Sequence, residues 1–362
     1  MSIKSGAQRL ADELSNQKRS NAHQRLGRLF DEGSFDELDA FVKTEGHQSE
    51  VVTGYGTING TPAYAFAQDK SICGGAMGLT QAAKIKKIYS LAAKTGLPVV
   101  GIYDSDGAYL LEGVDAMEAY GSLMNEVNRL SGVVPQLSLV LGSCAGCAAM
   151  MAASADILIV EKDAALYLTA PTLVGGNKAG SGTAQAVCEN GTAQLLAEGE
   201  NEALEQARTL VSMLPLNNLS PVPAAPAADP MADGCLFSNL VDGNSALELS
   251  PAFGKTVKTS FARVMGVTCG FVSMATEETD GRLDTDSCVK AARFVRLCDS
   301  FAIPVITLVD AAGFEATLKA ELGSGVRDAA MVSHAYAEAT TVKISLIAGK
   351  AYGPVYTAFA GK

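Results

Sequence analysis

The chain has 362 residues, of which 48% are hydrophobic and 19% are charged, and its formal net charge at pH 7 is -11. This length and composition predict more than one globular domain with large buried cores. The acidic balance, with a pI near 4.9, argues against a nucleic-acid or anionic-membrane partner, because such a partner needs a concentrated basic surface.

The first residues carry no apolar core of the kind found in signal peptides. Glycine, aspartate and proline interrupt the apolar stretches before they reach the ~18 residues of a membrane span. The eight cysteines fall mostly within apolar patterns and lack the paired spacing of a zinc site or a disulfide scaffold. We therefore expect a soluble cytoplasmic protein with reduced thiols and no metal site.

Residues 1–50 are predicted as a helical lead-in, because charged and apolar residues alternate at helical spacing over residues 6–44. A β-hairpin follows over residues 51–67, with β-branched and aromatic residues on both sides of Asn59-Gly60, a strong turn signal. The loop after the hairpin contains Gly74-Gly75, which permits the backbone to approach a ligand closely.

Strands and helices then alternate. The pattern predicts helices over residues 79–94 and 116–130, and strands over residues 97–103 and 156–160. Strands separated by helices imply crossover connections and a mostly parallel sheet, so the fold class is α/β.

The stretch from Val134 to Ser154 holds the centre of the predicted site. Leucines in alternate positions predict a buried strand, Gly142-Ser143 is the expected break, and a helix is expected from Ala148. The unpaired amides at the start of that helix point back into the turn and can hold an anionic oxygen. The alternatives are a close-packed strand-helix corner and, for Cys144 and Cys147, a redox pair.

Residues 215–230 contain five prolines with alanines and almost no charge, which predicts an interdomain linker. The domains are therefore expected over residues 51–214 and 231–362.

The second domain repeats the first. Seven residues of the first half recur at a constant offset of 206: Thr53, Gly60, Lys84, Leu91, Pro98, Asp104 and Gly107 return as Thr259, Gly266, Lys290, Leu297, Pro304, Asp310 and Gly313. The segment 138–147 matches 345–354 at an offset of 207. This repetition predicts a duplicated domain.

About seventy residues separate Gly146 from the linker, but only nine follow Gly353. We therefore expect the second copy to be incomplete, either as a fragment or as a domain that a partner chain completes.

These motifs resemble the carboxyltransferase subunits of biotin-dependent acyl-CoA carboxylases and decarboxylases, among them those acting on acetyl-, propionyl-, methylmalonyl- and glutaconyl-CoA. The resemblance rests on GTINGTPAYAFAQD, GGAMG, DSDGA with its following EG, GSCAGC and EATTVKISLIAGKAYG. It implies two crotonase-like halves, the second truncated, with an acyl-CoA thioester as substrate and biotin on a carrier protein as cofactor. It also implies a homodimer or larger homo-oligomer, and a biotin carboxylase or membrane decarboxylase subunit as a further partner.

The resemblance also assigns residues. In the first half, the acyl-CoA site would use the backbone amides of Gly74, Gly75, Ala76, Ala145, Gly146 and Cys147. In the second half, the biotin site would use Gly349, Gly353 and Val355, because Pro354 has no N–H. Each site would stabilise an enolate oxygen, so that no catalytic histidine is needed. The chain departs from the family where Asp106 and Cys147 replace glycines and where Tyr109 replaces an arginine, which removes an active-site cation.

Other functions stay open at this point. A biotin-independent crotonase-type hydratase or decarboxylase would need a carboxyl group near the first turn, and Glu112 is the candidate. A non-catalytic, truncated scaffold subunit is the third possibility. Lys84 to Lys87 either reach the phosphates of CoA or form a solvated helix face, and Asp104 and Asp106 either orient a substrate or cap turns. His334 is expected to be structural.

Overall fold

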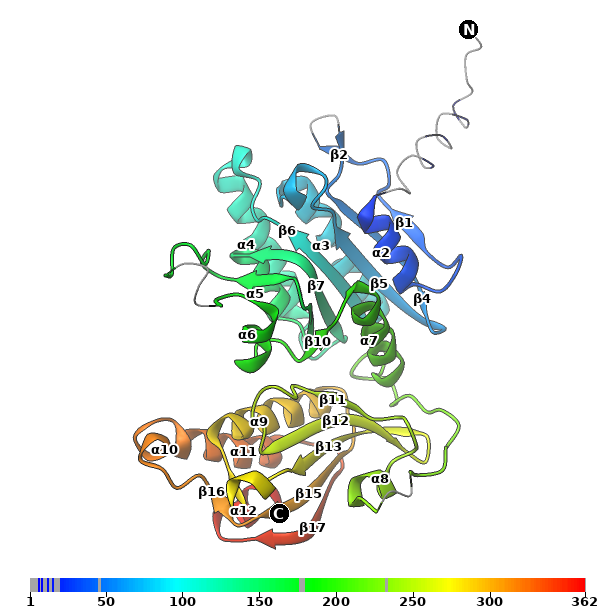
Figure 1. Ribbon diagram of the computed structural model, residues 1–362. Helices are drawn as coiled ribbons and strands as arrows, with labels where there is room; N and C mark the ends of the chain where they lie inside the picture. The colour runs from blue at the N-terminus through cyan, green and yellow to red at the C-terminus, as the bar shows by residue number, and fades with distance from the viewer. Residues whose placement is uncertain are drawn as a thin grey trace. The chain divides into compact units, whose positions relative to one another are not determined.

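Figure 1 shows the computed structural model, which describes residues 20–44, 47–175, 180–231 and 234–361 together with positions 6, 8, 12 and 15. The chain forms two compact units. The first holds Met1–Val187 and Leu196–Ser212, and the second holds Cys188–Leu195 and Met213–Lys362. Each unit is built on one main sheet with helices packed against it, which confirms the predicted α/β class.

The first unit contains an eight-stranded sheet in the order β1-β4-β5-β6-β7-β8-β10, with β9 paired to β7. β4 and β5 form the predicted hairpin, and both Asn59 and Gly60 have positive φ, as its two-residue turn requires. β5, β6, β7 and β8 run parallel to one another. The strands are β1 (Asp36–Leu38), β4 (Val51–Ile58), β5 (Thr61–Gln68), β6 (Val99–Ser105), β7 (Gln136–Ala145), β8 (Ile157–Glu161), β9 (Ala165–Tyr167) and β10 (Leu195–Ala197), with β2 (Lys43–Thr44) and β3 (His47–Gln48) as a separate pair.

Helices lie against both faces of this sheet. On one face, the Tyr103 ring of β6 packs edge-on against Phe66, which also contacts Tyr89 of α3. The next residue, Asp104, points to the opposite face, where its carboxylate meets Arg25 of α2. The helices are α2 (Asn21–Leu29), α3 (Leu79–Thr95), α4 (Val114–Arg129), α5 (Cys147–Ala153), α6 (Ala184–Glu189) and α7 (Glu200–Met213), with short 3-10 turns at Cys73–Gly75 and Leu110–Glu112.

The second unit repeats this plan with a five-stranded sheet in the order β11-β12-β13-β15-β17. β12 and β13 form a hairpin, and β13, β15 and β17 run parallel. Its strands are β11 (Leu247–Leu249), β12 (Val257–Val264), β13 (Val267–Met274), β15 (Val305–Ala311) and β17 (Lys343–Ala351), with β14 (Arg282–Leu283) and β16 (Gly313–Phe314) as a separate pair. Its helices are α8 (Leu236–Leu240), α9 (Thr285–Ser300), α10 (Leu318–Leu322), α11 (Gly325–Glu338) and α12 (Pro354–Phe359), with a 3-10 turn at Glu277–Thr279.

The predicted duplication is visible residue by residue. Thr53 and Thr259 each donate a hydrogen bond to the neighbouring strand, at Leu38 O (3.0 Å) and Leu249 O (2.9 Å). Lys84 and Lys290 are both buried and donate to backbone carbonyls. Gly142 and Gly349 occupy matching places where a Cβ would overlap an aspartate carboxylate, that of Asp104 or Asp310. The same sequence pattern has thus produced the same strand pairing, buried polar contacts and close backbone approaches twice.

The two sheets differ beyond their last matching strands. β8 and β10 extend the first sheet past β7, whereas β17 is the outermost strand of the second sheet within the described residues. Apolar side chains on β17 are exposed, with Ile344 at 53% and Leu346 at 40%. The incompleteness of the second copy stays a prediction.

Three local expectations differ from the structure. Residues 1–50 are not wholly helical, because β1, β2 and β3 follow α2 within that range. Residues 215–230, predicted as an interdomain linker, lie within the second unit, where Ala225 N donates to Gly266 O at 2.9 Å and Pro230 bridges to Asp242. The strand β7 runs through Gly142-Ser143 without a break, so the turn before α5 is the single residue Gly146. No helix among the described residues is both long enough and apolar enough to span a membrane.

Candidate active site

The first turn lies where β7 gives way to α5. Gly146 joins the two elements with φ 58° and ψ -122°, a conformation that a residue with a Cβ rarely adopts. The Gly146 amide donates to Tyr167 O at 2.9 Å, and Ala145 pairs with Tyr167 in the sheet. Cys147 is the first residue of α5, so its amide has no acceptor within the helix, and none lies among the described residues. At this turn the Gly146 amide is therefore committed to Tyr167, and the Cys147 amide is available for a ligand.

The loop at Gly74, Gly75 and Ala76 shows the same division. The Gly75 amide donates to Ile72 O at 2.8 Å and the Ala76 amide to Cys73 O at 3.3 Å, so both are committed to the loop itself. The Gly74 amide has no acceptor among the described residues, and Gly74 has φ 70°. Gly75 packs so closely on the end of β6 that a Cβ would overlap Asp104 O. Glycine is therefore required here to bring the Gly74 amide up against the sheet.

The acidic residues after β6 all have protein partners. The Arg25 guanidinium holds the Asp104 carboxylate at 2.8 Å and also pairs with Glu200. The Glu112 carboxylate accepts from Leu79 N at 2.7 Å and so caps α3. Because Glu112 serves as a helix cap, it is poorly placed to act as the acid or base of a hydratase. No observation in the described residues favours that alternative.

A cation that the sequence analysis missed stands beside this turn. The Lys70 ammonium contacts Asp106 Oδ1 at 2.7 Å and donates to Ser143 Oγ at 2.8 Å. The hydrogen bond with Asp106 raises the pKa of Lys70. The available signal was a lysine two residues after β5, at the carboxyl end of a parallel strand, where ligand sites gather. The predicted lysines behave differently: Lys84 is buried and donates to Val51 O at 2.6 Å, and Lys87 pairs with Asp39.

The second turn copies the first in backbone form. Gly353 has φ 51° and ψ -121° between β17 and α12. Pro354 follows it and contributes no N–H, while the Val355 amide donates to Tyr352 O at 3.2 Å and the Val355 side chain is fully buried. Gly349 makes room for the Asp310 carboxylate and lies within β17. The Gly353 amide has no acceptor among the described residues and is available for a ligand.

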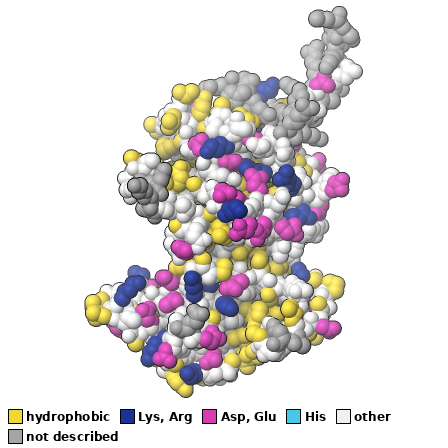
Figure 2. Space-filling view, in the orientation of Figure 1, with side chains coloured by type: hydrophobic (Ala, Val, Ile, Leu, Met, Phe, Trp, Pro, Cys, Tyr) yellow, Lys and Arg dark blue, Asp and Glu magenta, His cyan; other side chains and the backbone are white. Residues whose placement is uncertain are grey.

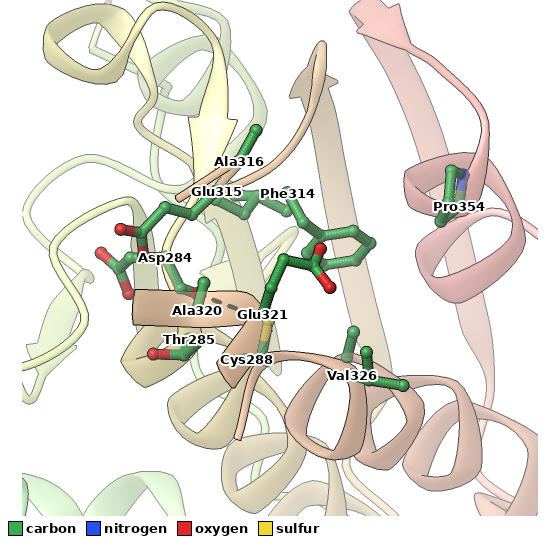
Figure 3. Close-up of a pocket in the computed structure, with 13 residues that line it drawn as sticks. Asp284, Thr285, Cys288, Phe314, Glu315, Ala316, Ala320, Glu321, Val326 and Pro354 are labelled. Atoms are coloured by element: carbon green, nitrogen blue, oxygen red, sulfur yellow. Dashed lines mark hydrogen bonds between the residues drawn. The ribbon is translucent and has the colours of Figure 1, made fainter. Parts of the chain in front are cut away.

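A cavity of about 350 Å³ opens beside the second turn (Figure 3). Its apolar lining includes Cys288, Phe314, Val326 and Pro354, and burial raises the pKa of the Cys288 thiol to about 12. The carboxylates of Asp284, Glu315 and Glu321 also line it. The lining therefore combines apolar side chains with three carboxylates.

The redox alternative for this region finds no support in the geometry. The described residues contain no group of three or more His, Cys, Asp or Glu side chains arranged to hold a metal ion. Cys144 and Cys147 are both free thiols, and burial raises the pKa of Cys144, which makes it a poor nucleophile for redox exchange.

Two strand-glycine-helix turns, each at the carboxyl ends of parallel strands in its own α/β unit, define a duplicated crotonase-like enzyme. A model of the carboxyl transferase domain family matches residues 15–362. The methylmalonyl-CoA decarboxylase subunit alpha of Propionigenium modestum is 37% identical over 378 residues, which cover 94% of this chain and 73% of that protein. The propionyl-CoA carboxylase beta chain of Roseobacter denitrificans is 36% identical over 395 residues, covering 99% and 77%.

Solved structures agree with these relatives. The transcarboxylase 12S hexamer with methylmalonyl-CoA and methylmalonic acid bound superimposes with a TM-score of 0.89 at 34% identity, covering 97% of this chain and 76% of that one. The chain therefore belongs to the carboxyl transferase family, the carboxyltransferases of biotin-dependent acyl-CoA carboxylases and decarboxylases, as its motifs predicted.

Proposed function

We propose that this protein moves a carboxyl group between the α-carbon of an acyl-CoA and biotin presented on a carrier protein. The first half would bind the acyl-CoA and the second half the biotin. The observation that carries this assignment is the duplicated glycine turn. Gly146 and Gly353 share a backbone conformation, and each turn offers one amide, that of Cys147 or of Gly353, with no acceptor among the described residues.

In the first half, the chain's contribution is electrostatic. When the bond between the α-carbon and the carboxyl group breaks, its electrons move into the thioester and leave negative charge on the thioester oxygen. The Cys147 and Gly74 amides are the donors available to bind that oxygen. One such donor contributes roughly 3–4 kcal/mol to transition-state stabilisation in other enzymes. Histidines are not required: the side chains of His23 and His334 pair with Glu37 and Glu338 outside this site, and the His47 side chain lies outside the described residues.

In the second half, biotin would supply or accept the carboxyl group at its ring nitrogen. The Gly353 amide would bind the ring carbonyl oxygen, and the apolar cavity beside Pro354 would exclude water from the ring. Pro354 leaves this half with fewer amide donors than the first.

The proposed substrates are short carboxylated acyl-CoA thioesters of the malonyl or methylmalonyl type and their decarboxylated products. Support comes from relatives whose names specify methylmalonyl-CoA or propionyl-CoA and from the methylmalonyl-CoA bound in the transcarboxylase core.

We also propose that the protein works as a homo-oligomer, because apolar side chains gather on the surface over the start of α4 (Figure 2), where Leu110 is 86% exposed beside Leu111, Val114 and Met117. The transcarboxylase core similar to this chain is a hexamer.

A biotin carboxylase or a membrane decarboxylase subunit is the proposed further partner. The proposed location is the cytoplasm, which suits eight free cysteines.

The function is tested by mass spectrometry of the purified chain with malonyl-, methylmalonyl- and glutaconyl-CoA, each with and without biotin. Biotin-dependent loss of the carboxyl group from at least one of them is expected. Loss that is independent of biotin would instead support a crotonase-type decarboxylase, and no loss from a folded chain would support a scaffold role.

A further inference from the structure

Lys70 sits on a rigid turn at the carboxyl end of β5. The neighbouring Asp69 is fully buried, its amide donates to Glu50 O at 2.8 Å, and its carboxylate accepts from Ala22 N at 3.2 Å and Ser71 N at 3.0 Å. These hydrogen bonds fix the backbone at Asp69 and Ser71, on either side of Lys70. The parallel strands β5, β6 and β7 end at one edge of the sheet (Figure 1), and Lys70 follows β5 at that edge.

The ammonium of Lys70 joins three elements at that edge. It extends from the loop after β5, contacts Asp106 after β6 at 2.7 Å, and donates to Ser143 near the end of β7 at 2.8 Å. Asp106 in turn lies against the Gly74 loop, since a Cβ on Gly74 would stand 3.3 Å from Asp106 Oδ2. The cation therefore stands next to the loop that offers the free Gly74 amide. Its partner Ser143 precedes Gly146 by three residues.

We propose that Lys70 and Ser143 form the binding site for the free carboxylate of a malonyl-type acyl-CoA, with Asp106 as the counter-ion that the substrate displaces. This inference rests on the proposed function and names the residues that recognise its carboxylated substrate. It accounts for the missing arginine at Tyr109, because Lys70 restores a cation to the first-half site.

The Lys70–Asp106 pair is suited to exchange. Its side chains are 44% and 57% exposed, so water screens the two charges and the pair is weak. The ammonium has three N–H donors, so it can keep its bond to Ser143 while it turns from Asp106 to a substrate carboxylate. The Ser143 hydroxyl can donate its own proton to the same carboxylate. An acyl-CoA without the carboxyl group has nothing to offer these two residues, so the pair distinguishes the carboxylated thioester from its product.

The test measures dissociation constants for malonyl-CoA and acetyl-CoA by calorimetry, with the full chain and its variants. Lys70→Met is expected to weaken malonyl-CoA binding about tenfold and to leave acetyl-CoA binding within about twofold of the wild type, because one charge-assisted contact is lost. Lys70→Arg should keep most of the malonyl-CoA affinity. Asp106→Asn should tighten malonyl-CoA binding, since the competing carboxylate is gone. Lys162→Met is the matched control: Lys162 forms a similar exposed pair with Glu198 at 3.2 Å, and its loss should change neither constant.

The outcomes separate the two proposals. If the wild type binds both thioesters and Lys70→Met leaves the preference for malonyl-CoA unchanged, the carboxylate site is elsewhere and the inference is wrong, while the proposed function stands. Equal losses for malonyl-CoA and acetyl-CoA would also overturn it, because they would mean a general effect on CoA binding. If the folded wild type binds neither thioester, the proposed function fails and the inference falls with it.

Discussion

The two halves have the same backbone arrangement at their turns but differ in the side-chain contacts around it. In the first half, the Asp104 carboxylate that packs against Gly142 is buried and clamped by Arg25 of α2 at 2.8 Å. In the second half, the matching Asp310 is exposed, accepts a hydrogen bond from the Lys350 amide at 2.8 Å, and lines an open cavity of about 520 Å³. The turns that follow also differ, because one begins its helix with Cys147 and the other with Pro354.

This difference shows which parts of a duplicated site are fixed by the main chain. Strand order, the close glycine approach and the positive φ of Gly146 and Gly353 are the same, since they follow from pairing and packing that tolerate little change. The charges around Asp104 and Asp310, and the number of free amides at each turn, differ because single side chains set them. Specialisation of the halves for different substrates therefore needs few substitutions.

The largest expected effect comes from removing the clamp that only the first half has. Arg25→Met leaves the Asp104 carboxylate buried without its cation, and breaking such a pair costs about 3–5 kcal/mol of the free energy of unfolding. Asp310→Asn in the second half should cost less than about 1 kcal/mol, because its carboxylate is exposed. Urea denaturation followed by circular dichroism measures both. Arg28→Met is the control, since the Arg28 side chain makes an exposed contact with Asn201 at 3.3 Å. If Arg25→Met and Asp310→Asn lowered the free energy of unfolding equally, the proposed difference between the two halves would be wrong.

The buried lysines sharpen the comparison through pH. Burial lowers the pKa of Lys290 from 10.5 to about 8, so between these values the unfolded chain binds the proton more tightly than the folded one. Folded-state stability therefore rises with pH across this window and is lowest below pH 8. Relative to Lys290→Met, the wild type should gain about 3 kcal/mol between pH 7 and pH 10.5. Denaturation at several pH values measures the gain. If the free energy of unfolding of the two proteins changed with pH in the same way, the pKa of Lys290 would not be lowered in the folded state.

The smallest effects should separate the two turns by function. Alanine at Gly146 or Gly353 has no steric clash at its Cβ but must adopt an unfavourable φ, which costs about 1–3 kcal/mol. Gly146→Ala should weaken acyl-CoA binding, whereas Gly353→Ala should leave acyl-CoA binding unchanged and slow biotin-dependent carboxyl transfer. Calorimetry and the transfer assay give the two readings. The assignment of substrates to halves would be reversed if the two variants showed the opposite pattern.

Much of this arrangement could be predicted from the sequence. The Asn59-Gly60 hairpin, the strand-helix alternation and the offset of 206 between repeats are local or periodic signals, and each was reproduced in the structure. The small residues placed the first turn too early, at Gly142-Ser143, because β7 continues to Ala145.

The sequence did not predict which hydrogen-bond partner each polar group has. Whether the Gly146 amide is free depends on an acceptor elsewhere in the chain, at Tyr167. The Arg25–Asp104 pair joins residues 79 positions apart, and Lys70 meets Ser143 across 73. Such partners are set by the tertiary fold, and no spacing rule reports them.

The central claim is that the Cys147 amide stabilises negative charge on the thioester, and exchanging the first residue of α5 tests it directly. Cys147→Pro copies the second half, and proline is tolerated at the first position of a helix, so the fold should survive while one N–H is lost. Cys147→Ala keeps the amide and serves as the matched variant. The account predicts that Cys147→Pro lowers kcat for biotin-dependent decarboxylation about 100-fold or more, with Cys147→Ala close to wild type. Near-wild-type kcat in a folded Cys147→Pro protein would contradict it.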